Sequence, residues 1–144
     1  MNIKTYKITS NDDLLQCLEI RKIVFIQGQN VPANEEIDGK DNTSQHYLLK
    51  VDDQAAGTAR VRFIDYYAKI ERVAILDEYQ GRGLGKVLMV KIMSDLQDQK
   101  NVKAAKLSSQ TYAIPFYEKL GFTVCSEEYL DANIPHKDMI LNLN

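Results

Sequence analysis

Apolar residues along the chain follow two repeats: alternation with a period of two, typical of strands, and spacing near 3.6, typical of helices. Alternating or short apolar runs predict strands over residues 3–8, 46–51, 55–64, 68–76, 104–109, 122–128 and 137–143. Helical spacing predicts helices over residues 10–25, 86–99 and 111–120. The order of these elements, β-α-β-β-β-α-β-α-β-β, predicts a mixed α/β fold in which helices pack on a single sheet.

Two segments follow neither repeat and are predicted to be loops. The first, residues 28–45, is long for so small a protein, and such loops are usually functional or mobile. The second contains the sequence NIPH at residues 133–136. Gly57 interrupts a strand pattern and indicates a bulge, and Gly121 fits the position of positive φ that ends a helix.

The size and charge of the chain exclude several classes of protein. At 144 residues it has the size of one domain, which we expect to span residues 1–144. The formal net charge of −2 provides no basic face for nucleic acid, and no apolar run reaches the length of a membrane span. Because the first residues also lack the apolar stretch of a signal peptide, we expect a cytoplasmic protein.

The cysteines and histidines form no disulfide or metal pattern. Cys17 and Cys125 lie in apolar runs, so both are predicted to be small core residues. His46 and His136 have no third ligand at a suitable spacing, so no metal site is predicted.

Three glycines fall within five positions of the segment ILDEYQGRGLG (residues 75–85), where a strand pattern gives way to a helix. Glycine weakens a helix start, so this spot must require bare backbone. Amides at such a junction bind anions with the help of the helix dipole, and Arg82 and Lys86 add positive charge. The spacing fits neither a Walker loop nor a dinucleotide fingerprint. The alternative interpretation is a flexible connector.

The motif QGRGLG resembles the Q/R-x-x-G-x-G/A pyrophosphate loop of the GNAT superfamily of acyl-CoA-dependent N-acyltransferases, with Gln80, Gly83 and Gly85 on its defining positions. The preceding RVAI resembles the strand that holds pantetheine, and QTYAIPFYEKLGF resembles the helix segment N-x-x-A-x-x-x-Y-E-K-x-G-F. Gln110 stands where the superfamily usually has Asn. The segments RKIVFIQGQNVPANEEIDGKD, SQHYLL and NIPHKDM are similar to the ElaA-like branch, which often has Gly where this chain has Asn133.

The resemblance implies a GNAT-like α+β fold with a mostly antiparallel sheet of about six to seven strands and about three to four flanking helices. It implies direct acetyl transfer from acetyl-CoA, the cosubstrate, to a primary amine of a small molecule or peptide, without a metal. The implied cofactor-binding residues are Val73, Ala74, Ile75, Gln80, Gly81, Arg82, Gly83, Leu84, Gly85, Lys86, Gln110 and Tyr117.

Two catalytic roles follow from the same resemblance. The N–H of Val73 polarises the thioester carbonyl, and Tyr117 protonates the leaving thiolate. A phenol with a pKa of about 10 suits that task because it stays protonated at neutral pH. Alternatively, Tyr117 only packs on the sheet with Tyr112 and Phe116.

The general base is open between two interpretations. Glu71 lies two residues before Val73, so strict alternation puts both side chains on one face, where the carboxylate would act through a water. Equally, Glu71 pairs with an arginine of a neighbouring strand, at position 60, 62 or 72.

The predicted substrate-binding residues lie in segments that resemble the branch's substrate side: Asp38, Asp41, His46 and His136. The acidic run EEID favours a cationic amine, although charged loops are often only solvated.

Two other functions remain open: an acyl-CoA-binding module of the same fold without catalysis, and a phosphate-binding enzyme of another kind. Edge strands after Cys125 would also permit a homodimer.

Overall fold

The computed structural model describes residues 1–143. The strands are β1 (Ile3–Lys7), β2 (Gln45–Val51), β3 (Gln54–Ile64), β4 (Tyr67–Ile75), β5 (Ala104–Gln110), β6 (Thr123–Val124), β7 (Tyr129–Asp131) and β8 (Ile134–Asn142). The helices are α1 (Asn11–Arg21), the π-helix η1 (Lys22–Gln27) that continues it, α2 (Ala33–Glu36), α3 (Leu84–Gln97) and α4 (Ile114–Lys119). The predicted mixed α/β class is confirmed.

One sheet contains all eight strands, in the order β1-β2-β3-β4-β5-β8-β6, with β7 added beside β8. The pair β4–β5 is parallel, and the other described pairs are antiparallel. The sheet thus has one strand more than the sequence predicts. The segment around residues 133–136, predicted to be a loop, instead forms the hairpin β7–β8. Ala132 and Asn133 turn it with φ of 51° and 62°, the left-handed pair that suits a tight hairpin.

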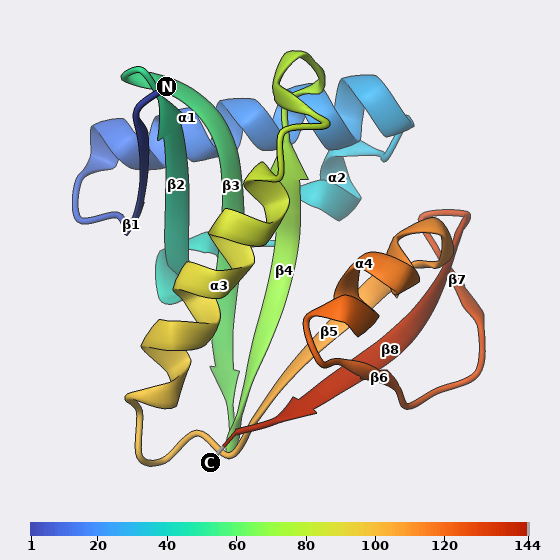
Figure 1. Cartoon of the computed structure of the whole chain (residues 1–144). Helices are drawn as coiled ribbons and strands as arrows, with labels where there is room; N and C mark the ends of the chain where they lie inside the picture. Colours follow the sequence, from blue (N-terminus) through green and yellow to red (C-terminus); the bar gives the residue numbers. More distant parts are fainter. Residues whose placement is uncertain (144) are drawn as a thin grey trace.

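Strands β4 and β5 separate partway along their length. They pair from Tyr67–Ala104 to Ile70–Leu107 and then diverge, so the sheet opens as a V (Figure 1). Helix α3 covers one face of β1–β4, and helix α1 covers the other; α4 lies in front of β5 and β8. Beyond Ile70 and Leu107, β4 and β5 therefore have no backbone pairing with each other.

Two apolar cores stabilise this arrangement. The larger lies between the sheet and helices α3 and α4, and includes Leu88, Ile92, Leu107 and Phe122. The smaller lies under α1 and includes Cys17. Cys125 is exposed, so the prediction that it is a core residue is wrong.

Several element boundaries differ from those predicted. The helix predicted over 10–25 becomes a π-helix from Lys22, and α3 begins at Leu84, earlier than predicted. The strand predicted over 122–128 is confined to Thr123–Val124. Gly121 has the expected positive φ, 103°, after α4. The bulge beside Gly57 is also present, at the register shift between β2 and β3.

No helix formed by residues 1–143 is long and apolar enough to cross a membrane.

Candidate active site

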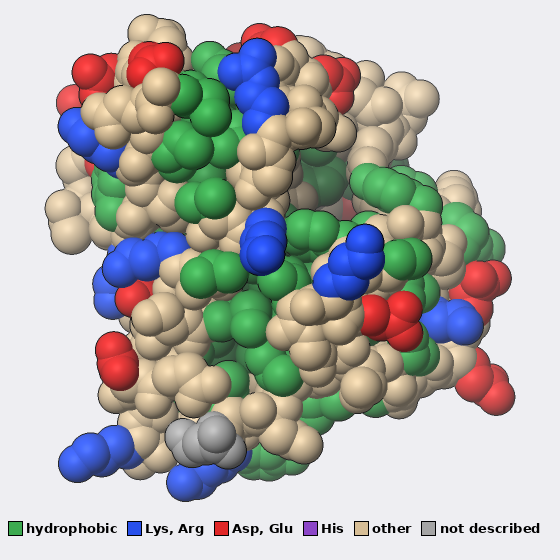
Figure 2. Space-filling view, viewed as in Figure 1, with side chains coloured by type: hydrophobic (Ala, Val, Ile, Leu, Met, Phe, Trp, Pro, Cys, Tyr) green, Lys and Arg blue, Asp and Glu red, His purple; other side chains and the backbone are tan. Residues whose placement is uncertain are grey.

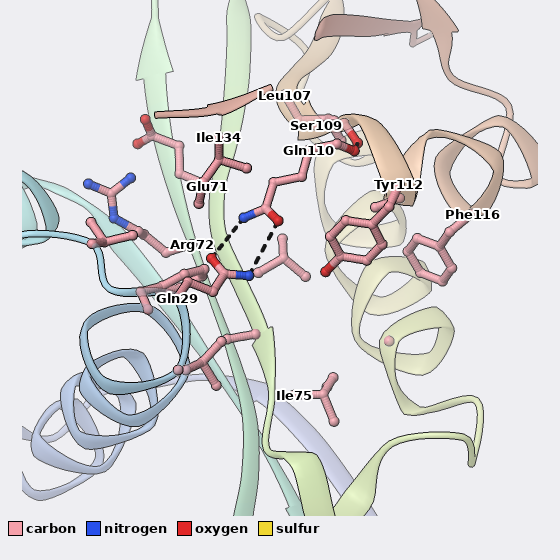
Figure 3. A pocket seen from close by; sticks show the side chains of 18 of the residues that line it. Gln29, Glu71, Arg72, Ile75, Leu107, Ser109, Gln110, Tyr112, Phe116 and Ile134 are labelled. Atoms are coloured by element: carbon pink, nitrogen blue, oxygen red, sulfur yellow. Dashed lines mark hydrogen bonds between the residues drawn. The ribbon is translucent and has the colours of Figure 1, made fainter. Parts of the chain in front are cut away.

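A cleft of about 860 Å³ occupies the V between β4 and β5. The glycine loop and α4 line its end on the α3 face, and η1, α2 and the β7–β8 turn line its other end. Figure 2 shows the hollow from the side of α3, with Lys and Arg side chains close to it. Figure 3 shows the interior, where side chains from both arms of the V converge.

The glycines of the loop serve two different purposes. Gly81 and Gly83 have φ of 78° and 73°, and no atom lies within 4 Å of where their Cβ atoms would be. They combine left-handed backbone, which glycine adopts at no steric cost, with open space, as close approach of a ligand requires. Gly85 has ordinary φ, but a Cβ there would lie 3.3 Å from Cζ of Phe116. Its absence of a side chain thus lets α3 pack against α4.

The other loop residues shape the start of α3. Gln80 donates a hydrogen bond from Nε2 to the carbonyl oxygen of Ile75 at 3.1 Å, which ties the loop to the end of β4. The Arg82 guanidinium stacks 5.5 Å from the ring centre of Tyr79. Leu84 is buried, so only its backbone faces outward, while Lys86 is exposed. The first-turn amides of α3 lie beside these groups, and such a helix start is suited to binding an anion. We call residues 80–86 the cradle.

A bulge in β4 overturns the predicted orientation of Glu71. Between the pairs Thr58–Ala74 and Arg60–Glu71, β3 contributes one residue and β4 contributes two. Arg72 in the bulge has φ of 56°. Alternation is therefore interrupted, and Val73 packs against the larger core while Glu71 lies on the opposite face. The expectation that Glu71 and Val73 share a face is wrong.

Glu71 pairs with two of the arginines considered. Its carboxylate lies 2.6 Å from Nε of Arg62 and 2.9 Å from Nη2 of Arg60. Burial by itself would raise the pKa of Glu71, but the hydrogen bond from Arg62 and the charge of Arg60 lower it below its usual value. Although Glu71 lines the cleft, this stabilised carboxylate is a weak proton acceptor.

Tyr117 is both a core residue and a cleft residue. It lies in the larger core with 9% of its surface exposed, and its ring meets that of Phe116 edge-to-face at 5.0 Å. It also lines the cleft beside the glycine loop. Burial raises the pKa of its hydroxyl, so it remains protonated at neutral pH. The predicted packing with Phe116 is observed, whereas Tyr112 is 78% exposed. The proton-donating role of Tyr117 stays a prediction.

Gln110 and His136 lie on the acceptor face, our name for the face of the β5–β8 pair turned away from α3 and α4. Leu107 and Met139 pair in register and point into the larger core, so Gln110 and its partner His136, three residues along each strand, point the other way. The side chain of Gln110 is hydrogen-bonded to that of Gln29, which the sequence analysis did not identify.

The ring of His136 is fixed in one orientation. Its Nδ1 lies 2.6 Å from the carbonyl oxygen of Ile134, and its ring stacks on Tyr129. Because a carbonyl oxygen only accepts, Nδ1 carries a hydrogen, which in the neutral ring leaves the lone pair on Nε2. His136 lines the cleft and is the one predicted substrate residue that does so.

Asp38, Asp41 and His46 do not line this cleft, and their predicted contact with a substrate stays a prediction. Asp38 and Asp41 bind the buried guanidinium of Arg60 at 2.8 and 3.1 Å, and Asp41 also binds Arg21 at 2.7 Å. His46 Nε2 lies 2.9 Å from the backbone oxygen of Asp41. These residues anchor the loop after η1 to the sheet.

The described part of the chain contains no group of three or more His, Cys, Asp or Glu side chains arranged to hold a metal ion.

Comparison with known families gives a consistent result. The family model for the acetyltransferase (GNAT) domain matches residues 22–143. A Bacillus subtilis (strain 168) protein described as an acetyltransferase is 42% identical over 139 residues, which cover 94% of this chain and 92% of that protein.

Two solved structures share the fold. Escherichia coli ElaA has a TM-score of 0.88 and 28% identity, over 96% of this chain and 99% of ElaA. In sequence comparison, ElaA of strain K12 is 30% identical over 90% of this chain and 88% of its own length. A GNAT family acetyltransferase from Elizabethkingia anophelis, solved with acetyl-CoA bound, has a TM-score of 0.78 at 17% identity, over 99% of both chains.

Proposed function

The chain belongs to the GNAT family of acetyltransferases, and on this basis we propose that it transfers an acetyl group from acetyl-CoA directly to a primary amine. The observation that carries the proposal is the cleft between β4 and β5, which has the glycine-rich cradle at one end and His136 on the acceptor face. Donor and acceptor would approach from opposite faces and meet between β4 and β5.

The cradle suits the diphosphate of coenzyme A. Gly81 and Gly83 leave room for it, and the amides at the start of α3 supply hydrogen-bond donors aligned with the helix dipole. Arg82 and Lys86 add positive charge at the edge. Beyond the cradle, the end of β4 from Val73 to Ile75 has no partner strand on its β5 side, and its backbone groups there would bind the pantetheine arm.

Two groups would assist the departure of the thiol. The Val73 amide, displaced from regular pairing by the bulge, would donate to the thioester carbonyl as negative charge develops there. Tyr117, protonated and buried beside the cradle, would give its proton to the sulfur.

On the acceptor face, His136 would take the proton of the incoming amine. In the neutral ring Nε2 holds the lone pair, and the Nδ1 hydrogen bond keeps the ring in place. We assign this role to His136 rather than Glu71 because the carboxylate of Glu71 is engaged by Arg60 and Arg62.

The test is a calorimetric titration with acetyl-CoA, followed by release of free coenzyme A in the presence of polyamines, amino acids and peptides. The proposal expects binding and amine-dependent release. Binding without release for any amine would favour a non-catalytic acyl-CoA-binding module. Stronger binding of ATP than of coenzyme A would favour a phosphate-binding enzyme of another kind.

A further inference from the structure

Two glutamine side chains meet in the middle of the cleft. Gln110 donates from Nε2 to Oε1 of Gln29 at 2.8 Å, and Gln29 donates from Nε2 to Oε1 of Gln110 at 3.3 Å. Figure 3 shows the two dashed bonds side by side, joining residues from opposite walls. The pair links segments 81 positions apart in the sequence and uses both polar atoms of each amide.

Each partner is placed by an irregularity of the backbone. Gln29 lies two residues beyond the end of the π-helix η1, and next to it the amide of Val31 reaches back to the oxygen of Phe25 at 3.0 Å. Such π-helical turns are rare and occur often at functional sites. Gln110 ends β5, three positions beyond the last β4–β5 pair at Leu107. The amide pair therefore spans the V where backbone pairing has ceased.

The pair lies on the route of the acceptor. Gln110 points to the acceptor face, where it is in register with His136. The cradle and Tyr117 lie toward the opposite face, with α3 and α4. A nucleophile approaching from the acceptor face must pass the two amides before it can reach the thioester carbon.

We infer that Gln29 is a specificity-determining residue: paired with Gln110, it closes the cleft to water until an amine acceptor displaces the pair. The inference rests on the proposed acetyl transfer. The reaction it suppresses is hydrolysis, in which water forms the new C–O bond, the C–S bond breaks, and the sulfur takes a proton from water. The products are free coenzyme A and acetate, and the second proton of the water is released to solvent.

The suppression follows from the shape of the pair. Two planar amides joined edge to edge form one rigid barrier, and a single water molecule cannot replace both hydrogen bonds at once. An acceptor that carries its own donor and acceptor groups beside the amine can replace them. The structure thus assigns to Gln29 the selection of an amine over water as the nucleophile that attacks the thioester.

The experiment measures free coenzyme A released from acetyl-CoA without any amine. Gln29→Ala and Gln110→Ala are each expected to raise this rate about fivefold, the factor that corresponds to one net hydrogen bond. The double variant is expected to release no more than the faster single variant, because either change removes the whole pair. Gln29→Asn, which keeps the amide but shortens its reach, is expected to behave like Gln29→Ala.

Controls separate this inference from the proposed function. Gln27→Ala changes an exposed glutamine of the same π-helix and is expected to hydrolyse at the wild-type rate. Wild-type protein that binds acetyl-CoA, together with variants that hydrolyse no faster than it does, would overturn the inference alone. Wild-type protein that binds no acetyl-CoA would overturn both. If the rate increases of the two single variants multiplied in the double variant, this would also contradict the pairing.

Discussion

The Nε atom of Arg72 lies 2.7 Å from Oε2 of Glu36, which joins the bulge of β4 to helix α2. The same carboxylate oxygen lies 2.9 Å from Nη2 of Arg21, and Glu36 is almost fully buried. Positive φ is unfavourable for arginine, so these contacts help to hold the bulge in place. The conformation of β4 beside the cleft therefore depends on Glu36 of helix α2.

Glu36→Gln is expected to lower the free energy of unfolding by about 3 kcal/mol, because Arg21 and Arg72 lose the buried negative charge that they bind. Urea unfolding followed by circular dichroism measures the change. Glu35→Gln, at the exposed neighbouring position, is the matched control and is expected to change stability by less than about 0.5 kcal/mol. Equal stabilities of the two variants would contradict the structural role of Glu36.

Tyr117→Phe is expected to reduce kcat about 100-fold while acetyl-CoA affinity stays nearly constant, since only the proton donor is lost. Steady-state kinetics with the amine found in the screen, together with calorimetry, separate the two effects. Tyr112→Phe removes a hydroxyl from an exposed tyrosine of the same cleft and serves as the control. Unchanged turnover in Tyr117→Phe would end the assignment.

Gly83→Ala and Gly39→Ala form a matched pair. Both glycines have positive φ, 73° and 79°, with open space where a Cβ would stand. Each alanine is expected to cost about 1 kcal/mol of stability. Only Gly83→Ala is expected to weaken coenzyme A binding, by about tenfold, because only Gly83 lines the cleft. A similar loss of affinity in both variants would show that general destabilisation, and not the cradle, is responsible.

Acid is expected to destabilise the protein through the loop carboxylates. The hydrogen bond from Arg60 lowers the pKa of Asp38 well below its ordinary value of 3.8, although burial opposes this. The unfolded chain therefore binds protons first, so the stabilisation by Asp38 is complete above that value and is lost as the pH falls below it.

The measurement is urea unfolding across a pH series. Asp38→Asn is expected to be less stable than wild type by about 2 kcal/mol at pH 6 and to show a flatter decline in acid. Asp53→Asn, at an exposed surface ion pair, should follow the wild-type curve. A wild-type slope in Asp38→Asn would assign the acid sensitivity to other groups.

Local sequence signals predicted much of the end of the cleft that the glycine loop and α4 line. A glycine such as Gly83 indicates positive φ by itself, and the apolar spacing that follows predicts α3. Neither prediction depends on distant parts of the chain. Tyr117 likewise lies in a segment whose own apolar spacing is enough to predict a helix. The family resemblance and the fold class were predicted for the same reason.

Long-range pairing could not be predicted in this way. Asp38 and Asp41 sit in a polar loop and look solvated, but their partners Arg21 and Arg60 are distant in sequence and buried inside an apparently apolar pattern. Gln29 carries no distinguishing signal at all. The hairpin turn at Asn133 did have a sequence signal, because asparagine in a short turn between alternating segments is typical of β-hairpins.

The extra residue in β4 shifts the phase of the strand between its two ends. Ala68 and Ile70 contribute to the larger core before the bulge, and Val73 and Ile75 do so after it, so even and odd positions exchange roles. A β4 that kept Arg72 but paired regularly with β3 would turn one end of the strand over. A graft or alignment that ignores this offset would bring charged groups into the apolar interior and aliphatic ones out to solvent.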